Sequence, residues 1–375
     1  MLLRIGVLAV FVGMIAVPGA DAAGPSHPSP HSGSRSQIAA PTAEQLIGAI
    51  LVPDQPAVSA LLRAGANPNG VWNGLTPIHH AANLADPAIL KLLLKHGADP
   101  NTMTSWGTTA LMRSTNPDNP ENVRLMIGAG ARLEQEGKDG STVVFIAAYF
   151  NKPKALQVLL SHGAKPDVPN SSGTTPLMAA ATSGAIEPLK ALLSAGASID
   201  KTNKFGQSAL LLAANRGKSD AMQVLIASKA DLNLRDASGS NVLKLLIDGR
   251  LSPEKKLLAL EQLRNAGFDF KQPCVGAISG VSYAFQTGQN PSFLEGLLEV
   301  SPEPNQADQD GSTPLHLAAL RGNLTWARIL LGHHADARIR NGAGNTPFWI
   351  ALTSHPTQLR LWGILGLARL GLYRR

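Results

Sequence analysis

The sequence is poor in the residues that build compact chemical sites. It has one cysteine, Cys274, in 375 residues, which excludes an intramolecular disulfide framework and a multi-cysteine metal site. Aromatic residues make up only 5% of the chain. The nucleophile-elbow pattern Gly-x-Ser-x-Gly does not occur, and no motif places a carboxylate pair or a Cys/His pair. We therefore predict that the protein is not an enzyme and that it uses no cofactor.

Residues 1–320 carry no net charge, because their basic and acidic residues balance. The net charge is +7, and the segment from Arg321 onward, with eight arginines and Asp336 as its single acid, carries all of it. The arginines form no runs with interleaved aromatic residues, which is what a nucleic-acid surface would need. We predict no nucleic-acid binding and interpret this segment as a solvated end of the chain.

The N-terminal segment has the pattern of an export signal. Arg4 is followed by an apolar run from Ile5 to Val17, and Ala20-Asp21-Ala22 supplies small residues for cleavage. Thirteen apolar residues are too few to span a bilayer, so residues 1–22 are predicted to be a removed signal peptide. We expect export to the periplasm, with secretion as the second alternative. Residues 23–41 are rich in Pro, Ser, Gly and His and are predicted to form a disordered tether.

The rest of the chain repeats with a period of 33 residues. The period is marked by glycines at positions 74, 107, 140, 173, 206 and 239, and again at 311 and 344. Within a unit, Thr-Pro such as Thr175-Pro176 favours a helix start, a Leu pair such as Leu192-Leu193 lies in a second helix, and Gly196-Ala197 favours its end. A fixed period of this length indicates stacked copies of one small helical unit.

Two of the units carry a longer motif. Thr76-Pro77-Ile78-His79 and Thr313-Pro314-Leu315-His316, each followed by Ala-Ala, resemble the fingerprint of the ankyrin repeat. The resemblance implies an all-α, ankyrin-type helical solenoid of about ten repeats over residues 42–375, with projecting hairpin loops and a concave face. It also implies that His79 and His316 tie neighbouring loops together. Repeats at 236–307 are irregular, either as a hinge or through drift, and 341–375 would be an apolar and basic C-terminal cap.

Aromatic residues stand at loop tips where the resembled family usually has Asp or Asn. Trp106 and Phe205 directly precede turn glycines, and Trp72 lies one position earlier in its unit. Exposed aromatic side chains are enriched at protein contacts, so these three are the predicted partner-binding residues. The alternative is that each ring folds back onto the adjacent loop.

The last repeat ends in a segment that is apolar on every face if it is helical. Trp362, Arg360 and Arg369 are therefore candidates for a membrane-surface or dimer contact, and the alternative is a buried closing helix. The neighbouring histidines His79-His80 and His333-His334 cannot chelate one ion, because adjacent helical residues point about 100° apart. No metal site is predicted.

These observations indicate an exported module that binds a partner protein through loop tips and concave face, as a periplasmic accessory, protector or inhibitor. A secreted effector that binds host proteins and a repeat scaffold at a membrane surface are the alternatives.

Overall fold

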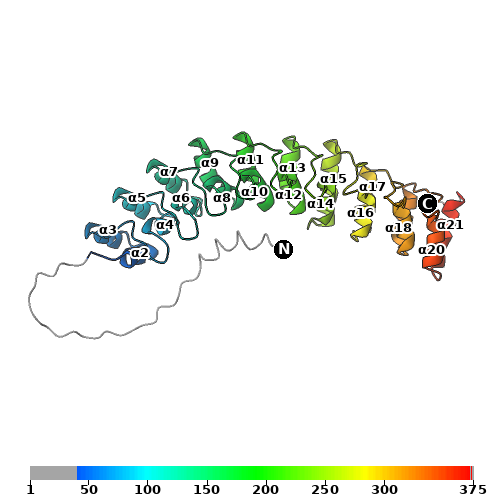
Figure 1. Cartoon of the computed structure of the whole chain (residues 1–375), viewed down its shortest axis with the longest axis horizontal. Coiled ribbons are helices and arrows are strands. Elements are labelled where there is room, and N and C mark those ends of the chain that lie inside the picture. The colour runs from blue at the N-terminus through cyan, green and yellow to red at the C-terminus, as the bar shows by residue number, and fades with distance from the viewer. Residues whose placement is uncertain (1–39, 372, 374–375) are drawn as a thin grey trace, which may run out of the picture. The chain divides into compact units, whose positions relative to one another are not determined.

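The computed structural model describes residues 40–371 and 373. The predicted signal peptide (1–22) and most of the predicted tether (23–41) lie outside these residues. Within them the protein is all-helical, with twenty α-helices, no β-strand and isolated β-bridges at three turns. The helices follow one another as ten pairs (Figure 1). The pairs are α2 (Ala43–Leu51) with α3 (Gln55–Arg63), α4 (Pro77–Ala81) with α5 (Ala88–Lys95), α6 (Ala110–Ser114) with α7 (Pro120–Gly128), α8 (Val143–Tyr149) with α9 (Pro153–Ser161), α10 (Pro176–Ser183) with α11 (Ile186–Ser194), α12 (Ala209–Asn215) with α13 (Ser219–Ala227), α14 (Val242–Asp248) with α15 (Pro253–Asn265), α16 (Gly280–Gln286) with α17 (Pro291–Val300), α18 (Pro314–Leu320) with α19 (Leu324–Gly332), and α20 (Pro347–Ser354) with α21 (Leu359–Arg369).

The chain divides into two compact units. Among the described residues, unit 1 contains 40–147 and 154–164, and unit 2 contains 148–153 and 165 onward. In unit 1 the first helices of successive pairs pack on one another, α2 on α4 and α4 on α6, as do the second helices α3, α5 and α7. In unit 2 the first helices pack in the order α10, α12, α14, α16, α18, α20, and the second helices pack in the order α11, α13, α15, α17, α19, α21. The predicted helical solenoid of about ten repeats is confirmed.

The local signals in the sequence produce the helix ends that they predict. The hydroxyl of Thr175 accepts the N–H of Met178 at 3.3 Å, Pro176 occupies the first turn of α10, and the helix stops at Gly184 with φ of +79°. Such a cap satisfies a backbone donor that has no partner inside the helix. Each helix is short, so its stability depends on packing against the next pair rather than on the helix itself.

Leucine pairs supply the core between the two rows of helices. Leu93, Leu159, Leu192 and Leu330, the first residue of each pair, are fully buried. Full burial of a leucine side chain contributes roughly 1.5–3 kcal/mol. The second leucine of a pair points less deeply into the core, since consecutive residues lie about 100° apart around a helix.

Side-chain amides connect one repeat to the next. Asn69 donates to the Gly97 carbonyl at 2.9 Å and accepts the N–H of Asp99 at 2.8 Å. Asn101 makes the same two bonds one repeat later, with the Gly130 carbonyl and the N–H of Arg132. These bonds satisfy the carbonyls at helix C-termini, which otherwise have no partner, and they link residues about one repeat apart.

The irregular repeats at 236–307 still form two helix pairs. The ammonium group of Lys256 is buried between them. It donates to the Ile247 carbonyl at 2.6 Å and to Gln289 Oε1 at 2.8 Å, and it lies 5.6 Å from the centroid of the Phe293 ring. Burial lowers the pKa of Lys256. This lysine therefore ties α14, α15 and α17 together at the place where the sequence period is broken.

Candidate functional site

The loop tips of unit 1 carry two tryptophans in different environments. Trp72 is half-buried, and its backbone exchanges two hydrogen bonds with Leu75 across a tight turn. Trp106 is 41% exposed. Its ring lies against Gly74 of the preceding loop, since a Cβ atom added to this glycine would be 3.3 Å from a ring atom. The Trp106 ring therefore rests on the preceding loop with much of its surface still in contact with solvent. The sequence allowed an exposed contact residue or a ring folded onto the adjacent loop, and Trp106 has features of both.

The loop tip of Phe205 belongs to unit 2. Its side chain is 47% exposed, and its carbonyl accepts the N–H of Ala237 at 2.9 Å from the next loop. Gly206 permits this close approach, since it has φ of +69° and an added Cβ would lie 2.8 Å from the Ala237 nitrogen. This hydrogen bond between loops holds the backbone at Phe205 in place, which lowers the loop entropy that would be lost when a partner binds.

The fingerprint histidines join neighbouring repeats, as the resemblance implied. Nδ1 of His79 accepts the N–H of Thr76 at 3.3 Å, and its Nε2 donates to the Thr102 carbonyl of the next repeat at 3.2 Å. His316 makes the equivalent bonds with Thr313 and with the Asn345 carbonyl. These bonds need a neutral ring, because a protonated Nδ1 cannot accept the backbone N–H.

A buried cationic group that the sequence reading missed lies beside His79. The guanidinium of Arg113, on α6, donates from Nε to the His79 carbonyl at 2.6 Å, and the residue is only 7% exposed. Burial first, and Arg113 second, lower the pKa of both His79 and His80 to about 4. The Nε2 atom of His80 has no hydrogen-bond partner among the described residues. The sequence held one signal for the burial of Arg113. This residue stands four positions after the cap of its helix, where α10 and α12 have the apolar residues Ala179 and Leu212.

The structure shows neither an exposed thiol nor a metal-binding cluster in the part of the chain that it describes. Cys274 is fully buried, and burial raises the pKa of its thiol to about 12, so it stays protonated near neutrality. Across residues 40–371 and 373, no group of three His, Cys, Asp or Glu side chains is placed to hold a metal ion.

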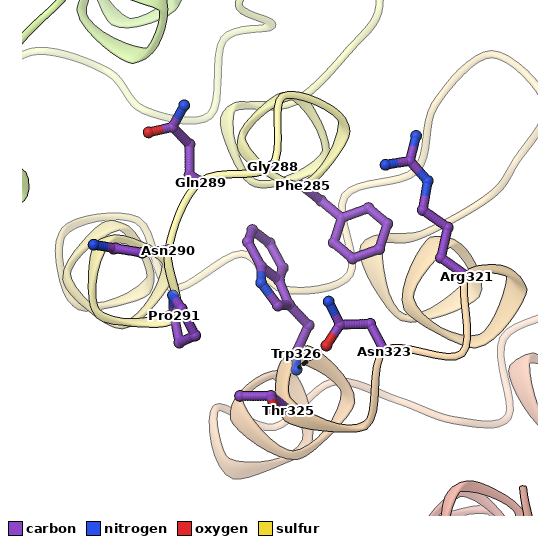
Figure 2. A pocket seen from close by; sticks show the side chains of 9 residues that line it. All are labelled: Phe285, Gly288, Gln289, Asn290, Pro291, Arg321, Asn323, Thr325 and Trp326. Atoms are coloured by element: carbon purple, nitrogen blue, oxygen red, sulfur yellow. Dashed lines mark hydrogen bonds between the residues drawn. The ribbon is translucent and has the colours of Figure 1, made fainter.

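A pocket of about 390 Å³ opens between the eighth and ninth helix pairs, in unit 2. Figure 2 shows the rings of Phe285 and Trp326 side by side at its centre, with Gln289, Asn290 and Pro291 to one side and Arg321 to the other. The two rings meet edge to face with centroids 4.8 Å apart, and the Arg321 guanidinium lies 5.2 Å from the Phe285 centroid. No sequence motif pointed to this pocket.

The C-terminal helix is apolar on two sides. Leu361 and Leu365 are buried against the preceding helices, whereas Leu359, Leu367 and Leu370 are 70%, 48% and 71% exposed. The indole N–H of Trp362 donates to the carbonyls of Ala351 and His355, so this ring fixes α21 to α20. Arg360 and Arg369 are exposed. Among the described residues, none of the helices is both long enough and apolar enough to cross a membrane.

Comparison with protein families finds two models that match this chain. The model "Ankyrin repeats (3 copies)" matches residues 46–136 and 114–203, and "Ankyrin repeats (many copies)" matches 192–246 and 298–351. The interval 247–297, which lies between these matches, contains the helices α15 and α16 and the buried Lys256.

Curated relatives share only short stretches with this chain. The potassium channel AKT2/3 of Arabidopsis thaliana is 38% identical over 71 residues, which are 19% of this chain and 9% of the channel. The human ankyrin repeat domain-containing protein 13C is 39% identical over 54 residues, 14% of this chain and 10% of that protein. The chain thus spans about a tenth of the length of these relatives.

Solved structures cover more of the chain. The human ASB11 ankyrin repeat domain aligns with a TM-score of 0.50 and 25% identity, over 57% of this chain and 96% of that domain. The ankyrin repeat domain of Bcl-3, a member of the IκB family, aligns over 54% of this chain and 92% of that domain, with 27% identity and a TM-score of 0.48.

Proposed function

Because the chain belongs to the ankyrin repeat family, whose repeats generally mediate protein–protein interaction, we propose that it is an exported protein-binding module. It recognises a partner protein through its loop tips and the first helices beside them, the expected concave face. It works by binding alone, as a periplasmic accessory that holds, protects or inhibits its partner.

The observation that supports this proposal is the pair of exposed aromatic rings at loop tips. Trp106 is 41% exposed and Phe205 is 47% exposed, although only 5% of the chain is aromatic. The Trp106 ring lies against the preceding loop, and a hydrogen bond from the next loop holds the backbone that carries the Phe205 ring. Rigid, exposed aromatic side chains are the residues that most often dominate the energy of a protein interface. Each unit thus presents at least one such anchor.

The export of the protein is part of the proposal and rests on the pattern of residues 1–22. A secreted effector that acts on host proteins shares this pattern. Fractionation of cells that express the full chain, with mass spectrometry of the mature N-terminus, separates these alternatives. Recovery from the periplasm with cleavage near Ala22 supports the first, recovery from the medium supports the second, and an uncleaved chain in the cytosol refutes both.

Binding through the loop tips is tested with matched surface variants. The mature chain is cross-linked in periplasmic extracts, and the protein that it retains is purified and titrated. Trp106→Ala and Phe205→Ala should each weaken this binding by about thirtyfold, a loss of about 2 kcal/mol that is typical of an interface hot spot. Trp72→Ala should have a smaller effect, since its ring is half-buried.

The controls are exposed side chains of second helices, away from the loop tips and the first helices. Lys91→Ala on α5 in unit 1 removes an exposed side chain, and Leu258→Ala on α15 in unit 2 removes an apolar side chain that is 50% exposed. They should leave the affinity unchanged, and all variants should keep the helical content of the parent. Equal affinity of the loop-tip variants and the parent would exclude these residues from the interface. The activity of the purified partner with and without this protein then shows whether binding protects or inhibits.

A further inference from the structure

The pocket beside Phe285 exists where aromatic residues replace alanines of the regular repeats. Phe285 stands six residues after the cap of its helix, and the equivalent residues in four other repeats are Ala82, Ala181, Ala214 and Ala319. Trp326 stands three residues after the cap of α19, where α13 has Ala221. The turns of the eighth and ninth helix pairs meet at these two rings, which lie 4.8 Å apart and line the pocket.

The floor of the pocket is apolar and its rim offers hydrogen-bond donors. Phe285 and Trp326 are only 4% and 3% exposed, so their accessible edges form the floor. Arg321 is exposed, stacks on Phe285 and forms no ion pair within the described residues. None of the lining residues is Asp or Glu. A cation without a carboxylate beside it leaves its donors available to an anionic ligand.

Two helices begin at this pocket. The side-chain oxygen of Asn290 accepts the N–H of Phe293 at the start of α17, and that of Asn323 accepts the N–H of Trp326 at the start of α19. Their amide NH₂ groups have no acceptor in the part of the chain that is described. Helix N-termini favour negative charge, so the N-termini of α17 and α19 would attract an anionic ligand, as the Arg321 guanidinium does. Gln289, by contrast, is occupied by Lys256 and by the Ile247 carbonyl.

We propose that this pocket binds a carboxylate that carries a small apolar group, with the carboxylate on Arg321 and Asn323 and the apolar group against Phe285 and Trp326. A volume of about 390 Å³ lies at the lower end of the range of ligand pockets, about 300–1,000 Å³, and suits the last residue of a polypeptide or a free branched acid. The site is independent of the loop tips, because it is lined by the turns that join the first and second helices of two pairs.

The test compares an acid with its amide on the mature chain. N-acetyl-L-leucine and N-acetyl-L-leucinamide are titrated while the chain, labelled with fluorotryptophan, is followed by ¹⁹F NMR. The Trp326 resonance is assigned from Trp326→Phe. The acid should shift this resonance with a Kd in the millimolar range, and the amide should bind at least about tenfold more weakly, since a charge-assisted hydrogen bond contributes about 1.5–3 kcal/mol. Equal shifts by both compounds, or none up to about 50 mM, would overturn the proposal.

Matched variants locate the site. Arg321→Gln should weaken binding of the acid at least about tenfold, whereas Arg328→Gln, an exposed arginine of α19 outside the pocket, should leave it unchanged. Phe285→Ala restores the residue of the regular repeats and should abolish binding. If Phe285→Ala does not fold, the comparison of Arg321→Gln with Arg328→Gln still tests where the acid binds. Retention of binding by Arg321→Gln would refute the assignment.

A third compound distinguishes the source of the carboxylate. 4-Methylpentanoate has the same apolar group and carboxylate but lacks the peptide group. Tighter binding of N-acetyl-L-leucine supports the C-terminus of a polypeptide as the ligand, and tighter or equal binding of 4-methylpentanoate supports a free branched acid. Inorganic phosphate should compete only weakly, because Arg321 and the two helix N-termini attract it but the rings give it no apolar contact. Competition by phosphate as effective as that by N-acetyl-L-leucine would contradict the proposed ligand class.

Discussion

Acidification from pH 7 to pH 5 should destabilise α4 and the helices packed on it. His79 and His80 are held there as neutral imidazoles, and burial followed by the charge of Arg113 lowers the pKa of each from 6.5 to about 4. Protonation of His79 would place a proton on Nδ1, which accepts the N–H of Thr76. It would also add positive charge beside a guanidinium that forms no ion pair among the described residues.

The sign and size of the effect follow from proton linkage. In the unfolded chain these imidazoles take up protons near pH 6.5, so between pH 6.5 and pH 4 the unfolded state binds more protons than the folded state. The neutral histidines therefore contribute their full stabilisation above pH 6.5. The free energy of unfolding falls as the pH decreases from 6.5 towards 4. With these two pKa values, one histidine accounts for a loss of about 2 kcal/mol between pH 7 and pH 5. The two losses do not simply add, since the two rings interact.

Hydrogen exchange measured by mass spectrometry reports this loss locally. After correction for the intrinsic effect of pH, amides in α4 to α6 should exchange about thirtyfold faster at pH 5 than at pH 7, which corresponds to about 2 kcal/mol. The matched variant His79→Met/His80→Ala should show almost no change. Its residues are those of α10, where Met178 and Ala179 hold the same positions and the sulfur of Met178 accepts the N–H of Thr175 at 3.4 Å.

Two results would refute this reasoning. One is an equal response to pH in the parent and in the His79→Met/His80→Ala variant. The other is slower exchange of α4 at pH 5. His316 gives an internal check in unit 2, because burial also lowers its pKa, and α18 should respond in the same direction.

Three further predictions concern the links between repeats and the end of the chain. Amides in α14 to α17 should exchange as slowly as those in α10 to α13, and Lys256→Met should accelerate them; fast exchange in the parent would instead show a hinge. Asn69→Ala removes two hydrogen bonds and should lower the free energy of unfolding by about 1–2 kcal/mol in urea titrations; an unchanged midpoint would contradict the role of these amides. If α21 contacts an anionic membrane, Leu367→Ser/Leu370→Ser should reduce co-sedimentation with anionic vesicles while Leu320→Ser does not; absence of binding by the parent would exclude the membrane alternative.

The sequence predicted the elements of the fold with good accuracy where a signal acts over a few residues. Thr175-Pro176 marked the start of α10, and Gly184 ended it with a positive φ. Leu192 was correctly placed in a second helix, α11, and its side chain is buried. Each prediction depends on a cap, a turn or a helical period, which are decided by atoms no more than about four residues apart.

The surface was harder to predict than the fold. Trp72 and Trp106 read alike in the sequence, but the first is half-buried and the second is 41% exposed. Arg113 was not singled out in the sequence and is buried beside His79. Trp362 was a candidate for an external contact, and the hydrogen bonds that its indole donates to α20 and to the residue after it could not be read from the sequence. In each case the outcome depends on a neighbouring repeat or helix that the local pattern does not specify.

By itself, the sequence determined the period of 33 residues, the positions of the caps and the apolar side of most helices. Only the tertiary structure decided which polar groups lose water, which aromatic rings remain exposed and where a pocket opens. The physical reason is the distance along the chain. A cap or a turn is completed within one repeat, whereas the environment of His79, Phe285 or Lys256 is made by atoms about 20 to 40 residues away.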